Sequence, residues 1–158
     1  MGTGGLRRLL LAGAVLGALV LVSVLRTADD DEPSVARPAS TLTVTDQKDG
    51  DSFVASDGRE YRVGMVDTPE PGQPCFEEAG AFTRDFLADG FSARPYDEDR
   101  YGRVVAEVLD ADGRSLNVAL ASSGLAGDRY LEGFRDDDPG LARRLDDAFA
   151  SARRPSCR

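Results

Sequence analysis

The first forty residues differ from the rest of the chain in their hydrophobic pattern. Residues 9–25 are an unbroken run of apolar and small residues in which Ser23 is the only polar one. A helix of this length spans about 26 Å, close to the roughly 30 Å of a bilayer core. The run therefore predicts a transmembrane anchor or a signal peptide. The basic residues 1–8 before it are expected to stay in the cytoplasm.

These two interpretations differ in whether the segment is cleaved. Signal peptidase prefers small residues at positions −3 and −1, and cleavage after Ala28 would put Arg26 at −3. The sequence therefore favours an uncleaved anchor, and both interpretations place the rest of the chain outside the cytoplasm. Residues 26–40 contain acidic residues and two prolines, a composition that predicts a flexible linker.

From Thr41 onward the pattern changes to short segments, and residues 41–158 are expected to form one domain. A period of two with β-branched residues predicts five strands, at residues 41–45, 52–56, 60–66, 92–96 and 104–109. A helical period predicts three helices, at residues 77–87, at 115–122 and from Pro139 to Ala152.

The order of these elements is three strands, a helix, two strands and two helices. A five-stranded, partly open barrel with a helix after the third strand is typical of the OB-fold. The predicted fold class is mainly β with α: an OB-fold barrel of five strands with three helices, preceded by an N-terminal hydrophobic helix. Such barrels commonly bind nucleic acid on one face.

The charge of the chain argues against nucleic-acid binding at first sight. Its 158 residues carry a net charge of −9, whereas nucleic-acid binders usually show a basic patch. A bound metal ion can, however, reverse the sign of the potential inside a carboxylate site. Lys48 is the only lysine, so arginine and acidic residues dominate. A GC-rich genome would explain this bias, but we favour adaptation to high salt, which screens acidic self-repulsion.

The chain contains no histidine. This excludes Ser-His and Cys-His nucleophilic dyads and nearly every histidine metal site. The two cysteines cannot form a structural zinc site alone. Catalysis would therefore depend on carboxylates, arginines, hydroxyls and a hard cation.

Two aspartates are the first candidates for such a cation site. Asp51 begins the second predicted strand and Asp67 ends the third, so pairing of these strands would bring their carboxylates together. Two carboxylates, a backbone carbonyl and waters suit calcium. Pro69 restricts Thr68 to extended geometry and presents Glu70 on a loop. There Glu70 could orient or deprotonate an attacking water.

Arg62 and Arg103 are candidates for binding a phosphodiester through bidentate contacts. Arg62 lies five residues before Asp67, which places the two on opposite faces of an ideal strand. Either the strand bends or bulges between them, or Arg62 reaches round its edge. Each arginine alone would be an ordinary surface ion-pair partner.

Together these residues resemble the staphylococcal nuclease (thermonuclease) family, over roughly residues 42–152. The matching segments follow in the family's order: Asp49-Gly50-Asp51, Arg62, Val66-Asp67-Thr68-Pro69-Glu70, Glu78-Ala79-Gly80-Ala81-Phe82-Thr83, Asp99-Arg100-Tyr101-Gly102-Arg103, Ser115-Leu116-Asn117 and Gly124-Leu125-Ala126. The resemblance implies calcium bound by three of these residues, with a fourth as general base. The ligands that the resemblance implies are Asp51, Asp67 and the Thr68 carbonyl, and the base that it implies is Glu70.

The resemblance also implies how substrate binds. Arg62 and Arg103 would contact the scissile phosphate, Tyr101 would lie near a terminal phosphate, and Tyr130 would line the base pocket. Family members cleave DNA and RNA with little sequence preference and leave 3′-phosphate ends. This chain departs from the family's best-known member by Glu132 in place of a second pocket tyrosine, a shorter loop after the general base and no lysine-rich surface.

The two cysteines, Cys75 and Cys157, lie outside this set. In an exported domain they predict one disulfide, which would tie the active-site loop to the C-terminal tail. Two free thiols are the alternative. Closing a loop of roughly 80 residues would contribute about 4.5 kcal/mol in the chain-entropy model.

The sequence is compatible with three functions. The first is a calcium-dependent nuclease with DNA and RNA as substrates, a membrane contact only through residues 9–25, and no implied protein partner. The second is a non-catalytic OB-fold module that only binds nucleic acid or protein, and the third is an acidic structural surface protein. A degenerate module would be expected to lose active-site residues, and all five are present here, which favours the enzyme: Asp51, Arg62, Asp67, Glu70 and Arg103.

Overall fold

A computed structural model describes residues 41–153 and Cys157. The predicted anchor or signal peptide and the linker, residues 1–40, lie outside this part of the chain. None of the helices within the described part has the length and apolar character of a membrane span.

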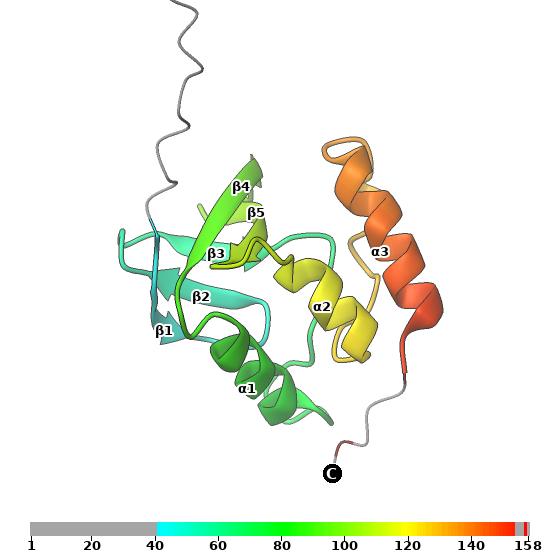
Figure 1. The fold of residues 1–158 in the computed structure, drawn as a ribbon, viewed down its shortest axis with the longest axis horizontal. Helices are drawn as coiled ribbons and strands as arrows, with labels where there is room; N and C mark the ends of the chain where they lie inside the picture. Colours follow the sequence, from blue (N-terminus) through cyan, green and yellow to red (C-terminus); the bar gives the residue numbers. More distant parts are fainter. Residues whose placement is uncertain (1–40, 154–156, 158) are drawn as a thin grey trace, which may run out of the picture. The chain divides into compact units, whose positions relative to one another are not determined.

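Five strands and three α-helices make up the domain, as the sequence predicts (Figure 1). The strands are β1 (Val44–Gln47), β2 (Ser52–Ala55), β3 (Glu60–Val63), β4 (Phe91–Glu98) and β5 (Val104–Asp110). The helices are α1 (Phe76–Phe86), α2 (Leu116–Ser123) and α3 (Pro139–Ser151), with one unpredicted 3-10 turn, η1 (Glu132–Phe134). The strands form one sheet in the order β1-β2-β3-β5-β4, in which only β3 and β5 are parallel neighbours.

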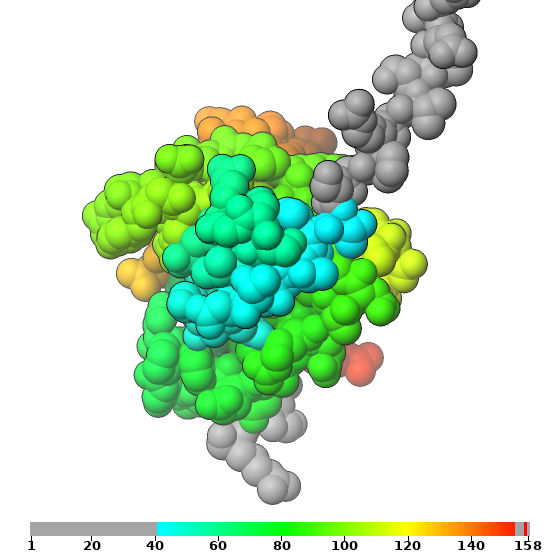
Figure 2. All heavy atoms as spheres, turned by 90° about the vertical axis from the view of Figure 1, so that its left-hand side faces the viewer, coloured from blue at the N-terminus to red at the C-terminus, as the bar shows by residue number. Residues whose placement is uncertain are grey.

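The two edges of this sheet meet at one point. Leu42, just before β1, exchanges two backbone hydrogen bonds of 2.8 Å with Phe91 at the start of β4. The sheet is therefore curled and only partly open, which is consistent with the predicted OB-like barrel. On the face in Figure 2, the segment of β1 and β2 covers the centre, and α1 with the segment before it lies below.

An aromatic cluster fills the barrel. Phe53 of β2 and Tyr61 of β3 are cross-strand partners, and their ring centroids lie 6.1 Å apart. Phe91 packs edge-on against both rings, at 5.3 and 5.6 Å. All three side chains are buried, so the end of β2 that carries the site residues is fixed to β3 by packing as well as by the backbone ladder.

Helices α2 and α3 pack side by side (Figure 1), and each begins at a side-chain cap. The Ser115 side chain accepts a hydrogen bond from the Val118 N–H, and the Asp138 side chain accepts one from the Leu141 N–H. Gly124 ends α2 with a φ of 77°, a left-handed conformation that glycine adopts without strain. The predicted starts and ends of both helices are thus confirmed to within one residue.

The third strand is shorter than predicted, because it ends at Val63 rather than at residue 66. Gly64 still donates to the Ala106 carbonyl, but Met65 has a φ of 61° and turns the chain out of the sheet. A Cβ at Gly64 would overlap the Tyr96 hydroxyl, so the turn requires glycine. The chain therefore bends between Arg62 and Asp67, and this bend lets both side chains lie on the same side despite their odd spacing in sequence.

The first and fourth strands also differ from their predicted limits. β1 extends to Gln47, with a register shift between Val44 and Asp46, so its pairing runs past the predicted end at residue 45. β4 extends to Glu98 because β5 pairs along its whole length, again with a shift after Pro95. Cross-strand pairing therefore overrides the weak local pattern at these ends.

The two cysteines are bonded in the structure. Cys75 lies directly before α1 and its Cα is 4.9 Å from that of Cys157, near the C-terminus. The bond closes a stretch of 82 residues and holds the end of the loop that follows Glu70.

Reduction of this disulfide should lower the free energy of unfolding by about 4.5 kcal/mol, because the unfolded chain loses its cross-link. Urea denaturation with and without reductant measures this difference, and a mass increase of two hydrogens on reduction verifies the bond. The Cys75→Ser/Cys157→Ser variant is the control and should not respond to reductant. Equal stability of the unaltered protein in both conditions would contradict the prediction.

The bend after β3 depends on Asn117, which is fully buried. Its Nδ2 donates to the Gly64 and Ala106 carbonyls at 2.8 and 3.2 Å, and its Oδ1 accepts from the Val108 N–H. Asn117→Ala would leave these buried backbone groups unpaired and should destabilise the fold by about 3 kcal/mol. Thermal denaturation measures the loss. Ser122→Ala, at an exposed position of the same helix, should cost far less.

Candidate active site

The turn between β1 and β2 positions Asp51. The Asp49 carboxylate accepts a hydrogen bond of 2.9 Å from the Asp51 N–H, as is typical of Asx turns. A Cβ at Gly50 would lie 2.8 Å from the Ala79 Cβ, so only glycine lets α1 pack this closely. The Gly50 carbonyl also accepts a hydrogen bond from the buried Thr83 hydroxyl. Asp51 thereby starts β2 with only 4% of its surface exposed.

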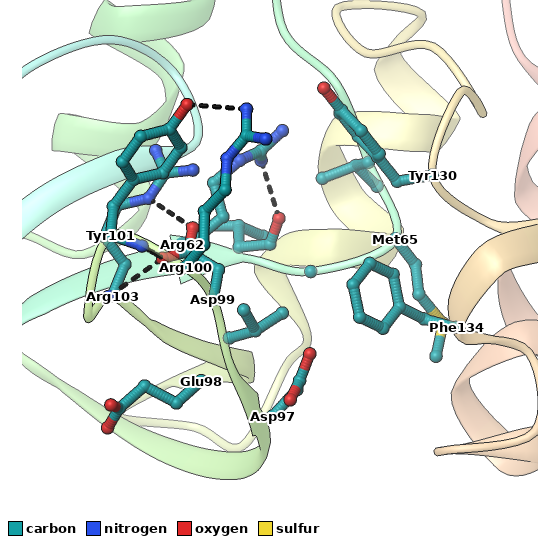
Figure 3. Close-up of a pocket in the computed structure, with 14 residues that line it drawn as sticks. Arg62, Met65, Asp97, Glu98, Asp99, Arg100, Tyr101, Arg103, Tyr130 and Phe134 are labelled. Carbon is teal, nitrogen blue, oxygen red and sulfur yellow. Dashed lines mark hydrogen bonds and ion pairs between the residues drawn. The ribbon is translucent and has the colours of Figure 1, made fainter.

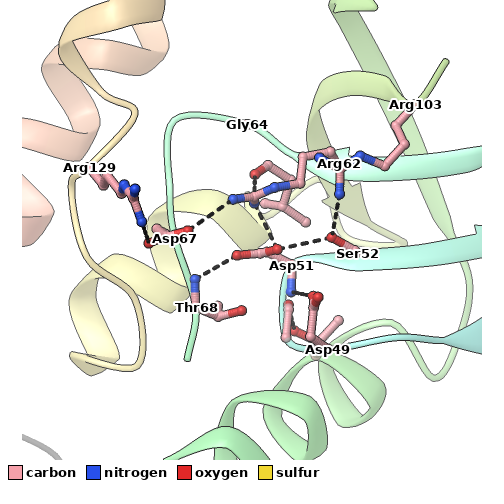
Figure 4. A network of polar contacts seen from close by, with 12 residues as sticks. Asp49, Asp51, Ser52, Arg62, Gly64, Asp67, Thr68, Arg103 and Arg129 are labelled. Carbon is pink, nitrogen blue, oxygen red and sulfur yellow. Dashed lines mark hydrogen bonds and ion pairs between the residues drawn. The ribbon is translucent and has the colours of Figure 1, made fainter. Parts of the chain in front are cut away.

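Both oxygens of the Asp51 carboxylate have partners (Figure 4). Oδ1 lies 2.8 Å from Nη1 of Arg62 and accepts a hydrogen bond from the Ser52 hydroxyl. Oδ2 accepts a hydrogen bond of 2.6 Å from the Thr68 N–H. One buried carboxylate therefore connects the start of β2, strand β3 and the segment that follows the bend.

The surroundings of Asp51 favour its neutral form more than water does. Burial raises the pKa of the Asp51 carboxyl to about 7; the positive charge of Arg62 opposes this rise and the negative charge of Asp49 adds to it. A cation that binds this carboxylate would therefore compete with a proton near neutral pH.

Asp67 lies on the other side of the same guanidinium. Its Oδ1 is 3.4 Å from Nη2 of Arg62, and its Oδ2 is 3.9 Å from Nη1 of Arg129 (Figure 4). The Arg62 side chain is 12% exposed and the Asp67 side chain 26%. The structure thus brings Asp51, Arg62, Asp67 and Thr68 together, and a single guanidinium bridges the two carboxylates.

Arg103 joins this group from the start of β5. Its Nε lies 2.7 Å from Oδ2 of Asp99, and its Nη1 is 3.4 Å from the Ser52 hydroxyl. Burial acts to raise the pKa of Asp99, but hydrogen bonds from the Arg103 side chain and backbone outweigh it and hold that pKa below its usual range. Asp99 therefore fixes the position of Arg103, and the Ser52 hydroxyl links Arg103 to the Asp51 carboxylate.

Tyr130 and Tyr101 line a cleft of about 420 Å³, where their rings lie against the guanidinium groups of Arg62 and Arg103 (Figure 3). The Tyr130 ring centroid lies 5.3 Å from the Arg62 guanidinium carbon, and the Tyr101 centroid lies 5.5 Å from that of Arg103. Tyr101 is 69% exposed and Tyr130 38% exposed, so both rings are accessible. The cleft combines arginine donors with exposed aromatic faces, a combination suited to a phosphate with an attached base. Three acidic side chains also line it, Asp97, Glu98 and Asp99, of which Asp99 is paired with Arg103.

Glu70 does not join the group. It is exposed in the loop before α1, where its N–H donates to the Gln73 side chain. Within the described residues, its carboxylate makes no ion pair with Arg62 or Arg103. The predicted general base is therefore near the site in sequence, but the structure does not bring it into contact with the other members. Glu132 also points elsewhere, because it pairs with Arg135 at 3.0 Å.

The residues around Arg62 fit a hard cation that takes oxygen ligands. The carboxylates of Asp51 and Asp67 both contact the Arg62 guanidinium, and the Thr68 hydroxyl is buried without a hydrogen-bond partner among the described residues. Over residues 41–153 and Cys157, no group of three or more His, Cys, Asp or Glu side chains could hold a metal. Backbone oxygens and water would have to complete the shell, as calcium permits.

Three residues of the site were given no role from the sequence: Ser52, Arg129, and Asp99, which was named only as part of a matching segment. Asp99 lies four residues before Arg103 across a turn at Gly102, so this local ion pair could have been found. Ser52 directly follows Asp51, but serine at a strand start is too common to be informative. Arg129 carries no local signal, because its place depends on a long-range backbone pairing.

Comparison with known proteins agrees with this geometry. Residues 60–154 match the family described as staphylococcal nuclease homologue. The chain belongs to the staphylococcal nuclease family. The matched segment includes Arg62, Asp67, Glu70 and Arg103, while Asp51 precedes it and owes its assignment to the contacts above.

This member of the staphylococcal nuclease family is similar in sequence to the succinoglycan biosynthesis protein ExoI of Rhizobium meliloti (strain 1021). It is 33% identical over 132 residues, which cover 74% of this chain. The chain spans 62% of the length of this curated relative.

The ion pair between Arg62 and Asp51 should be the strongest polar interaction of the site. Arg62→Gln removes the charge that opposes the rise of the Asp51 pKa, so at pH 8 the variant must either bury an unpaired carboxylate or protonate it, and it should lose about 3 kcal/mol of stability. Arg103→Gln, with a more exposed partner, should cost less. Urea denaturation measures both.

A double-mutant cycle isolates the pair. The Asp51→Asn/Arg62→Gln variant should be more stable than the sum of the single losses predicts, because neither group is left unpaired. This coupling should shrink at pH 6, below the Asp51 pKa of about 7, where the carboxyl is mostly protonated. Strict additivity at pH 8 would contradict the assignment.

Proposed function

We propose that this protein is a calcium-dependent, sugar-nonspecific nuclease that cleaves DNA and RNA outside the cytoplasm and leaves 3′-phosphate ends. The observation that carries the proposal is the convergence of Asp51, Arg62, Asp67 and Thr68, to which the Ser52 hydroxyl links Arg103 by two hydrogen bonds. Membership of the staphylococcal nuclease family supports it.

Each residue of the site has a role in this reaction. Asp51, Asp67 and the Thr68 carbonyl would hold the cation, which when bound supplies positive charge against a phosphate oxygen. Arg62 and Arg103 bind the remaining phosphate oxygens and stabilise the charge that develops as water adds to phosphorus. The bond from phosphorus to the 5′ oxygen then breaks, this oxygen takes a proton from solvent water and leaves as a 5′-hydroxyl end, and the phosphate stays on the 3′ side.

Glu70 is proposed to take the proton from the attacking water. A movement of the short loop between Asp67 and Cys75 would bring the exposed carboxylate toward the phosphate. The loop is held at both ends, by the pairing of Asp67 with Gly127 and by the bond from Cys75 to Cys157. Its motion is therefore confined to the few residues that carry Glu70.

The cleft beside the arginines is proposed to take the nucleotide. Tyr101 would lie near a terminal phosphate and Tyr130 would stack against a base. Glu132 would add nothing to stacking, since it is turned toward Arg135. Base contacts would thus be few, which supports cleavage with little sequence preference.

An extracytoplasmic location is proposed from the apolar run at residues 9–25, either as a membrane anchor or as a cleaved signal peptide. The bond between Cys75 and Cys157 supports this location, because disulfides persist in oxidising compartments. The acidic, lysine-poor composition supports a working environment of high salt.

Purified protein should degrade plasmid DNA and RNA with calcium and not with a chelator, from low to molar salt. Glu70→Gln and Arg103→Ala should each lower kcat by about 100-fold or more, since one removes the base and the other a transition-state contact. A fluorescent-substrate assay measures the rates, and circular dichroism verifies the fold.

Matched variants control for the loss of charge. Glu77→Gln removes an exposed carboxylate from α1, and Arg143→Ala removes an exposed arginine from α3. Both should keep full activity. If no condition gives calcium-dependent cleavage, the enzyme proposal is wrong and a binding module becomes the better account.

A further inference from the structure

Arg129 is the one arginine beside the carboxylates that neither the sequence motifs nor the proposed mechanism uses. We propose that Arg129 is a further substrate-binding residue, which Asp67 holds until a cation takes the Asp67 oxygens, and which then binds a phosphate of the nucleic acid. This inference rests on the proposed function and adds to it a link between cation binding and substrate binding.

The backbone places Arg129 at the site. Asp67 and Gly127 exchange two backbone hydrogen bonds, of 3.1 and 2.8 Å, so the segment after α2 runs beside the cation-binding loop. Arg129 follows two residues later, on this same segment, and Tyr130 comes next. Because Gly127 is paired to the backbone of a proposed cation ligand, the fold itself places the backbone of Arg129, two residues further on, near the site.

The two arginines that flank Asp67 differ in freedom (Figure 4). Arg62 is 12% exposed and is fixed by Asp51 and by the Val63 carbonyl, both at 2.8 Å. Arg129 is 72% exposed, and its ion pair with Asp67 is long, at 3.9 Å. Within residues 41–153 and Cys157 it has no other ion pair or hydrogen bond. An exposed pair of this length contributes little to stability, so Arg129 is easily released.

The Tyr130 ring offers a second contact for the Arg129 side chain when it leaves Asp67. The guanidinium carbons of Arg62 and Arg129 lie 5.3 and 5.6 Å from the centroid of this ring. Arg129 can therefore leave Asp67 and remain against Tyr130, at the edge of the cleft. A guanidinium there is suited to bidentate contact with a phosphate.

Charge explains why such a residue would matter in this chain. The protein carries a net charge of −9 and one lysine, so it lacks a general basic surface to attract a polyanion. Arginines at the cleft must supply the local positive charge instead. A cation on Asp67 would release Arg129 only when the site is ready for substrate, which couples the two binding events.

The test is binding of a short fluorescein-labelled single-stranded DNA, followed by anisotropy, in a Glu70→Gln background that prevents cleavage. With calcium, Arg129→Gln should weaken binding about tenfold and lower the slope of log affinity against log salt by roughly 0.7, as loss of one phosphate contact predicts. With chelator the difference should fall below about twofold, because the free carboxylates of Asp51 and Asp67 then repel the phosphate, in addition to the weak competition of Asp67 for Arg129. Arg143→Gln, which removes the same charge from α3, is the matched control and should show neither effect.

Two further measurements separate the role of Arg129 from a structural one. Arg129→Gln in the otherwise unaltered chain should raise KM about tenfold with kcat nearly unchanged. Its calcium affinity, measured by calorimetry, should stay within about threefold, since an exposed pair is weak.

Several results would overturn the inference: no loss of DNA binding in calcium, an equal loss in chelator, an equal loss with Arg143→Gln, or a parallel fall in calcium affinity. If the unaltered protein fails to cleave nucleic acid, the proposed function fails, while anisotropy still decides the role of Arg129. Absence of any DNA binding by the Glu70→Gln protein in calcium also overturns it.

Discussion

The buried carboxylate of Asp51 is the interaction on which the arrangement of the site depends. Its two oxygens connect three separate parts of the chain, through Arg62 on one side and the Thr68 N–H on the other. Each partner would be costly to leave unpaired in so buried a place, so the three segments hold one another in position. The bend after β3 then places the Asp67 carboxylate beside Nη2 of the Arg62 guanidinium.

The same arrangement explains how an acidic protein can present a site for a polyanion. The carboxylates of Asp51 and Asp67 are directed inward at Arg62, while Arg103, Tyr101 and Tyr130 face the cleft. Negative charge is thus concentrated where a cation would neutralise it, and Arg62, Arg100 and Arg103 line the cleft where phosphate would lie, together with Asp97, Glu98 and Asp99. The net charge of −9 describes the surface as a whole and not this local field.

Most of the fold could be predicted from hydrophobic period and turn residues. Both later helices begin and end as their caps predict, because capping is a local interaction. The end of β3 could not be predicted, since the left-handed Met65 is stabilised by Asn117, more than fifty residues from the Gly64 carbonyl that it binds. Interactions between segments distant in sequence leave no local pattern.

The candidate site shows the same division. The convergence of Asp51, Arg62 and Asp67 followed from strand pairing and was predictable, although the bend between the last two was only one of two options. Arg129 was not predictable, because the pairing of Asp67 with Gly127 brings it to the site. The exposed position of Glu70 depends on loop conformation, which the sequence does not specify.

The account rests above all on a cation site between Asp51 and Asp67. Calorimetric titration of calcium into the unaltered protein and into Asp67→Asn tests it most directly. The account predicts one site in the unaltered protein, proton release on binding near neutral pH, and loss of that site in the variant. No calcium binding by the unaltered protein, or equal binding by Asp67→Asn, would contradict it.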